Sequence, residues 1–147
     1  MKSEDLKRRM RVFALQVIRL LGDLPRNNVG DVIGRQLLKC GTSVGANYRS
    51  ACRAKSQADF ISKMGIVEEE ADEAIYWLDL LLEARMIPRQ KAEPLIGEAD
   101  QFVAIAVASI RTARRNQEKE KARPRSLNGP KRPSAGDSAL RTPQSAI

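Results

Sequence analysis

Apolar residues recur at steps of three and four positions through most of the first 115 residues, which is the spacing of one face of an α-helix. The first run predicts a helix from about Ser3 to Gly22 and consists of Leu6, Met10, Phe13, Val17, Leu20, Leu21 and Leu24. We expect Ser3 to be its N-cap, because a serine side chain can accept a hydrogen bond from the first turn. Pro25 and the pair Asn27 and Asn28 predict a break after this helix.

Helical spacing restarts near Asp31 and predicts a second helix that ends at about Ala51. Its apolar positions are Val32, Ile33, Leu37, Cys40, Val44 and Ala51. Gly34, Gly41 and Gly45 interrupt it, and each costs about 1 kcal/mol relative to alanine inside a helix. We interpret them as sites where another helix approaches closely. The alternative, a phosphate-binding loop, lacks both the Gly-Lys-Ser/Thr ending and a preceding strand.

A third helix is predicted from Ser56 to about Arg85, with Asp59 three positions after Ser56 as an acidic variant of the capping box. Its apolar face consists of Phe60, Met64, Val67, Ala71, Ala74, Ile75, Leu78, Leu81 and Leu82. A fourth helix either begins near Glu93 or bends there, because Pro94 has no N–H to donate. It continues to about Asn116.

This pattern predicts an all-α fold, an antiparallel up-down-up-down four-helix bundle over residues 1–116 with a disordered basic C-terminal tail. The tail, residues 117–147, holds four prolines and seven Lys or Arg against three acidic residues. It has almost no large apolar side chain, so it cannot offset the entropy of ordering. One domain and a tail are therefore expected.

The distribution of charge along the chain indicates what kind of partner it binds. The chain carries a formal charge of +8 and has a pI near 9.9. Residues 1–55 hold twelve basic and four acidic residues, whereas residues 56–84 hold one basic and eight acidic residues. A basic surface on the first two helices favours polyanions, because phosphate neutralisation releases counterions. The candidate nucleic-acid-binding residues are Lys7, Arg8, Arg9, Arg11, Arg19, Arg35, Lys39, Arg49, Arg53 and Lys55.

Histidine is absent, which excludes His-dependent triads, His-ligated zinc and an imidazole base. Cys40 and Cys52 lie twelve positions apart in one predicted helix, about 18 Å, too far for a disulfide. No apolar stretch is long enough to cross a bilayer. We therefore expect a cytoplasmic protein with reduced thiols and no cofactor, metal or enzymatic activity.

One stretch of sequence, from Ser43 to Pro88, carries a family resemblance. Its motif residues are Ser43, Asn47, Arg49, Ala54, Ser56, Asp59, Phe60, Glu70, Glu73, Tyr76, Trp77 and Leu78. The stretch resembles the four-helix-bundle proteins encoded within 23S ribosomal RNA intervening sequences. The resemblance implies pentameric rings and a kinship with the accessory variability determinant protein of diversity-generating retroelements. That relative implies nucleic acid, and a reverse transcriptase, as partners.

Several motif residues allow two interpretations. Ser43 and Asn47 share a helix face and form, with Arg49, either a polar binding cluster or a buried hydrogen-bond network between helices that fixes their register. Tyr76 and Trp77 either stack on a base or belong to the core or a subunit interface. Glu70 and Glu73 share a helix face, as the ligands of di-metal sites in helix bundles do. Such a site also needs histidine, which is absent, so we favour a solvated or ion-paired acidic face that also includes Glu69, Asp72 and Asp79.

The sequence thus predicts a non-enzymatic, homo-oligomeric protein that binds nucleic acid, RNA rather than DNA, through its first two helices and its tail. The alternative is a structural adaptor ring that presents its surface to a protein partner such as a reverse transcriptase.

Overall fold

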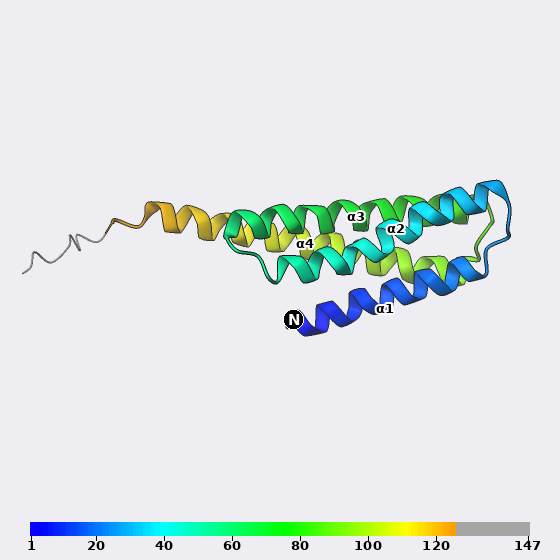
Figure 1. Ribbon diagram of the computed structural model, residues 1–147, viewed down its shortest axis with the longest axis horizontal. Helices are drawn as coiled ribbons and strands as arrows, with labels where there is room; N and C mark the ends of the chain where they lie inside the picture. Colours follow the sequence, from blue (N-terminus) through cyan, green and yellow to red (C-terminus); the bar gives the residue numbers. More distant parts are fainter. Residues whose placement is uncertain (126–147) are drawn as a thin grey trace, which may run out of the picture.

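Four α-helices make up the computed structural model, which describes residues 1–125 (Figure 1). They are α1 (Ser3–Gly22), α2 (Asn28–Ala51), α3 (Gln57–Glu83) and α4 (Arg89–Ala122). Each runs antiparallel to the one before it, and no strand occurs among these residues. The predicted up-down-up-down bundle is confirmed. Within residues 1–125, none of the helices combines the length and apolar character needed to cross a bilayer.

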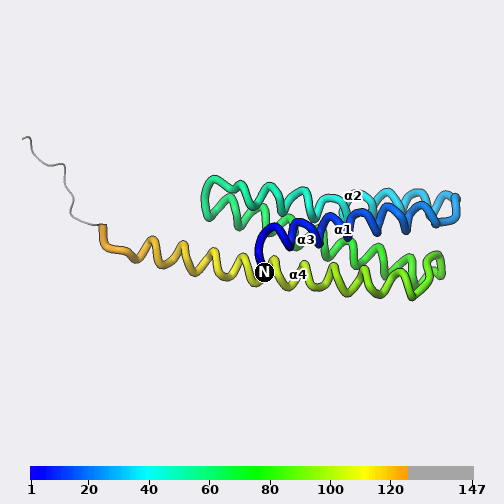
Figure 2. The backbone as a smooth tube through the Cα atoms, turned by 90° about the horizontal axis from the view of Figure 1, so that it is seen from below, coloured from blue at the N-terminus to red at the C-terminus, as the bar shows by residue number. Residues whose placement is uncertain are grey.

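The four helices do not contact one another equally. α3 packs extensively against both α2 and α4, α1 packs mainly on α2, and α1 and α4 touch least (Figure 2). Phe13 of α1 nevertheless meets Phe102 of α4 edge to face in the core, with ring centroids 5.5 Å apart. Both rings are fully buried, as are Met10, Leu37 and Met64. One continuous core therefore joins all four helices.

Three helix starts show how local sequence sets the boundaries. Ser56 caps α3 as predicted, since its Oγ accepts from the N–H of Asp59 at 3.1 Å, while the Asp59 carboxylate accepts from the N–H of Lys55. The cap predicted at Ser3 is wrong, because Lys2 holds that position without a side-chain cap. α2 begins three residues earlier than expected, because the side chain of Asn27 accepts from the N–H of Gly30 at 2.8 Å.

α4 differs most from its prediction. It begins at Arg89, directly after Pro88, and continues through Pro94 to Ala122. Residues 117–122, assigned to the tail from sequence, are thus helical, and α4 projects beyond the loop between α2 and α3 (Figures 1 and 2). Of the rest of the predicted disordered tail, residues 126–147 lie outside the described residues.

The glycines of α2 face α1, as the close-approach interpretation predicts. A Cβ on Gly41 would lie 3.2 Å from both γ-methyl carbons of Val17, and one on Gly45 would lie 3.3 Å from Cβ of Met10. These distances are tighter than most Cβ contacts, so a side chain at either position would have to displace its neighbour on α1. This close contact shapes the surface described next.

Candidate nucleic-acid interface

A groove of about 570 Å³ runs along the α1–α2 contact, where α1 begins and α2 ends. Its charged lining comes from both helices and consists of Glu4, Lys7, Arg8, Arg11, Arg49 and Arg53. Its other lining residues are Met10 and the small residues Ala14, Thr42, Gly45 and Ala46. Because small residues lie between the cations, an extended anionic chain can approach the helix backbones closely.

The groove has an uncompensated positive charge. Five cations face one carboxylate, that of Glu4. Lys7 pairs with Glu4 at 2.8 Å, and Arg8 lies 3.8 Å from Asp5. In the described part of the chain, Arg11, Arg49 and Arg53 have no carboxylate within 4.0 Å. Three guanidinium groups are thus open to an external anion, and guanidinium geometry suits phosphate.

The pKa of Glu4 reflects the cations that surround it. The hydrogen bond from Lys7 holds the pKa of Glu4 below its ordinary value, and the charges of Lys7, Arg49 and Arg8 lower it further. Arg49 reaches this carboxylate from the other helix, so cations of α1 and α2 act on the same space. The one carboxylate of the groove therefore stays ionised under ordinary conditions and offsets only part of the charge.

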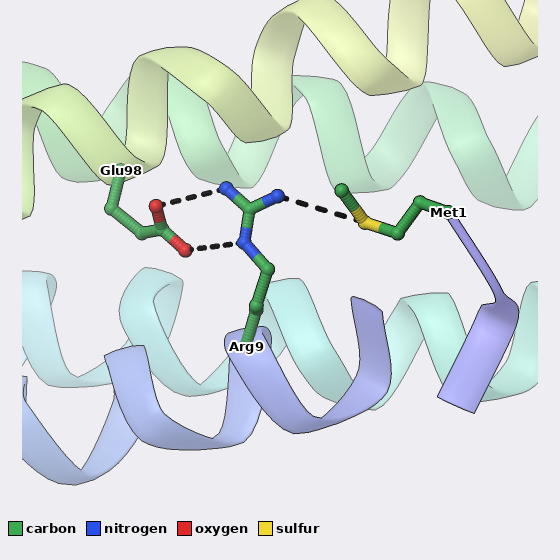
Figure 3. Close-up of polar contacts among 3 residues, drawn as sticks. All are labelled: Met1, Arg9 and Glu98. Atoms are coloured by element: carbon green, nitrogen blue, oxygen red, sulfur yellow. Dashed lines mark hydrogen bonds and ion pairs between the residues drawn. The ribbon is translucent and has the colours of Figure 1, made fainter. Parts of the chain in front are cut away.

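Arg9 does not belong to the groove, although sequence placed it among the candidate cations. It points towards α4, where Nε donates to one oxygen of Glu98 at 2.8 Å and Nη2 donates to the other at 2.9 Å (Figure 3). Its Nη1 contacts the sulfur of Met1 at 3.6 Å, and its guanidinium lies 5.5 Å from the ring centre of Phe102. Arg9 therefore fixes α1 to α4.

The other predicted cations are spread over the molecule. Arg19 and Arg35 line separate hollows towards the opposite end of the bundle. Lys39 lies near Glu70 on the α3 side of α2, where burial raises the pKa of that carboxyl and the charge of Lys39 partly opposes the shift. Lys55 lies in the loop between α2 and α3. Of the ten candidate cations, five therefore line the α1–α2 groove.

The motif residues Ser43 and Asn47 interact within one helix. The side-chain amide of Asn47 donates to the backbone carbonyl of Ser43 at 2.9 Å, so the predicted hydrogen bond between helices is replaced by one inside α2. Trp77 is half-buried against the core, and its indole N–H donates to Glu73 at 3.1 Å. Tyr76 is 58% exposed and meets Trp77 edge to face. The core interpretation thus holds for Trp77.

Glu70 and Glu73 lie on the face of α3 towards Cys40, whose thiol is buried. Burial, aided by both carboxylates, raises the pKa of Cys40 to about 12. One Glu73 oxygen is occupied by Trp77, and one Glu70 oxygen is buried without a hydrogen-bond partner among the described residues. Residues 1–125 contain no cluster of three or more His, Cys, Asp or Glu suited to a metal ion.

The sequence model of the 23S rRNA-intervening sequence protein family matches residues 2–108. The chain belongs to this family. A crystal structure of a Bacteroides thetaiotaomicron protein of unknown function, from the S23 ribosomal protein family, superposes with a TM-score of 0.69 at 34% identity. The alignment covers 76% of this chain and 99% of that one. No curated protein matches the chain.

This 23S rRNA-intervening sequence protein concentrates its cations in one half of the bundle. Residues 1–12, 44–63 and 107–125, which we call the basic half, contain sixteen basic and five acidic residues, against seven and twelve in the rest of residues 1–125. The basic half includes the groove and the last turns of α4, beyond the family match. Sequence reasoning included the cations from Lys119 onwards only as part of the basic tail and missed Arg111 and Arg115 as candidates, although Arg111, Arg115 and Lys119 recur at four-residue steps.

Proposed function

We propose that the protein is a non-enzymatic, homo-oligomeric nucleic-acid-binding protein that takes RNA in preference to DNA. One observation carries the proposal: the α1–α2 groove sets five cations against one carboxylate and leaves Arg11, Arg49 and Arg53 without an acidic partner in the described residues. No aromatic side chain lines the groove, so its contacts are to phosphate and tolerate any base sequence. The family description makes RNA the first probe.

Salt dependence of binding tests this proposal. The logarithm of the association constant for a labelled single-stranded RNA should fall linearly with the logarithm of salt concentration, by about 0.7 per neutralised phosphate. Arg49→Glu should weaken binding about tenfold and lower the slope by about one contact. Fluorescence anisotropy measures both quantities.

Arg26→Glu is the matched control. It makes the same change of charge at an exposed position in the loop between α1 and α2, outside the basic half. Under the proposal it leaves the affinity nearly unchanged. Equal effects of the two substitutions, or no RNA and no DNA binding at low salt, would contradict a phosphate-binding groove.

A second candidate function, an adaptor that binds a basic protein partner such as a reverse transcriptase, is favoured by the outer face of α3. Glu69, Asp72, Asp79 and Glu83 are exposed there around Tyr76. Within residues 1–125 none of these four carboxylates has a Lys or Arg nitrogen within 4.0 Å. Charge reversal on this face would weaken a protein partner without weakening RNA.

The same charge separation supports homo-oligomerisation. The acidic face of α3 in one copy complements the basic half of another, and exposed ion pairs of this kind orient an assembly more than they stabilise it. Apolar contact is available on α1, where Val12, Leu15 and Ile18 are 40–49% exposed. We expect the pentamer that the family resemblance implies.

A further inference from the structure

A second hollow, of about 370 Å³, lies where α3 begins and α4 leaves the bundle. Its lining includes one aromatic ring, Phe60, and four uncharged polar side chains, Gln57, Ser109, Thr112 and Asn116. Two alanines complete it, and no carboxylate is present. The combination of a ring and uncharged polar groups differs from that of the cationic groove.

Phe60 is the aromatic residue best placed to meet a ligand. It packs against the core but is only half-buried. Phe13, Phe102 and Tyr48 are buried, whereas Tyr76 and Trp77 lie on α3 among acidic residues that repel phosphate. These six are all the aromatic residues of the chain. Phe60 alone combines a partly accessible ring with a place in the basic half.

The polar groups around Phe60 match the edge of a nucleobase. The amides of Gln57 and Asn116 each offer donors and an acceptor, and neither makes a hydrogen bond to the described part of the chain. Thr112 is already engaged, because its hydroxyl donates to the carbonyl of Ala108 at 3.1 Å. A nucleobase stacked on Phe60 can therefore form hydrogen bonds along its own edge with these two amides.

Cations flank the hollow on two sides. Arg115 lies three residues after Thr112 and one before Asn116, at the edge of the face of α4 that lines the hollow. On the other side, Gln57 follows Arg53 of the groove by four positions, at most about 14 Å along the chain. A strand that leaves the groove at Arg53 can therefore reach the hollow by passing over the loop between α2 and α3.

We propose that the hollow at Phe60 is a base-stacking site for a single-stranded nucleic acid whose phosphates occupy the α1–α2 groove. This inference rests on the proposed function and narrows the ligand from nucleic acid in general to single strands. A base inside a duplex is stacked and paired and cannot enter, so the site selects single strands. A single ring and two amides give stacking with little sequence preference.

Three labelled probes of equal length test the site at one salt concentration: a single-stranded RNA, an abasic strand with the same number of phosphates, and the blunt duplex. The wild-type protein should bind the single-stranded RNA about tenfold more tightly than the abasic strand. Phe60→Leu should remove this preference and leave abasic-strand binding unchanged. Phe60→Tyr keeps a ring and should retain the preference.

Tyr76→Leu is the matched control, because it removes an exposed aromatic ring of the same helix outside the hollow. It should leave all three affinities as they are, and circular dichroism should show that every variant keeps its helices. Equal binding of single-stranded RNA and abasic strand by the wild type, or equal losses for both with Phe60→Leu, would overturn the base site alone. Loss of salt-dependent binding to every probe would instead overturn the proposed function together with the site.

Discussion

At the scale of single residues, Glu70 stands out in the contact between α2 and α3. Its Oε2 is buried without a hydrogen-bond partner among the described residues. Burial first, and then the charge of Glu73, raises the pKa of Glu70, while Lys39 opposes the shift. A raised carboxyl pKa means that folding disfavours the ionised form, so this carboxylate costs the folded state stability at neutral pH.

Replacement of Glu70 by methionine should therefore stabilise the protein at pH 7.5, by about 1 kcal/mol. The gain should shrink as pH falls through the raised pKa towards the ordinary value of 4.5, because the wild-type carboxyl then becomes protonated in the folded state. Urea unfolding at pH 7.5 and pH 4 measures the difference. Glu69→Met, at the exposed neighbouring position, removes only the last of the charges that act on Glu70 and should give a much smaller gain. A gain from Glu70→Met that is equal at both pH values would contradict the explanation.

Residue-level features were predictable where the partner is close in sequence. Ser56 caps α3 through an N–H three positions away, a spacing that the sequence displays directly. Arg9 looks like part of a phosphate-binding surface in the sequence, because its partner, Glu98, lies 89 positions further along the chain and local sequence does not reveal the pairing. Only tertiary packing brings that carboxylate to α1. The five cations that line the groove therefore could not be distinguished from Arg9 by sequence alone.

At the scale of elements, the contact between α1 and α2 depends on missing side chains. Gly41→Leu should destabilise the bundle by about 1–3 kcal/mol, because its Cβ alone would meet the methyl groups of Val17 at 3.2 Å. Thermal or urea unfolding measures the loss.

Gly65 offers the matched comparison, because a Cβ there would have nothing within 4 Å outside its own helix. Gly65→Leu should stabilise α3 by up to about 1 kcal/mol through helix propensity. If Gly41→Leu also stabilised the protein, the close-approach explanation of the α2 glycines would be wrong.

Helix boundaries were predictable where packing continues to the end of a helix. The bounds of α1 match the apolar pattern from Ser3 to Gly22, because its stripe faces the core throughout. The last turns of α4 have no such stripe, since they project past the other helices and bury little, so a pattern of apolar residues could not reveal them. At the start of α4, Pro88 rather than Glu93 sets the boundary.

At the scale of the whole molecule, the prediction concerns assembly. Native mass spectrometry of the intact 16.3 kDa chain should show a complex of five copies at low salt. Higher ionic strength should loosen it, because screening weakens the attraction between the acidic face of α3 and the basic half. A monomer at micromolar concentration in low salt would refute the proposed assembly and leave the groove proposal standing.

The pairing of Arg9 with Glu98 also has a consequence for how the chain is made. Successive hairpins join α2 to α3 and α3 to α4, whereas α1 meets α4 only after a long loop has closed, which is the slower event. α1 can pack on α2 as soon as α2 has been made, but the side of α1 that faces α4 stays uncovered until Glu98 and Phe102 have been synthesised.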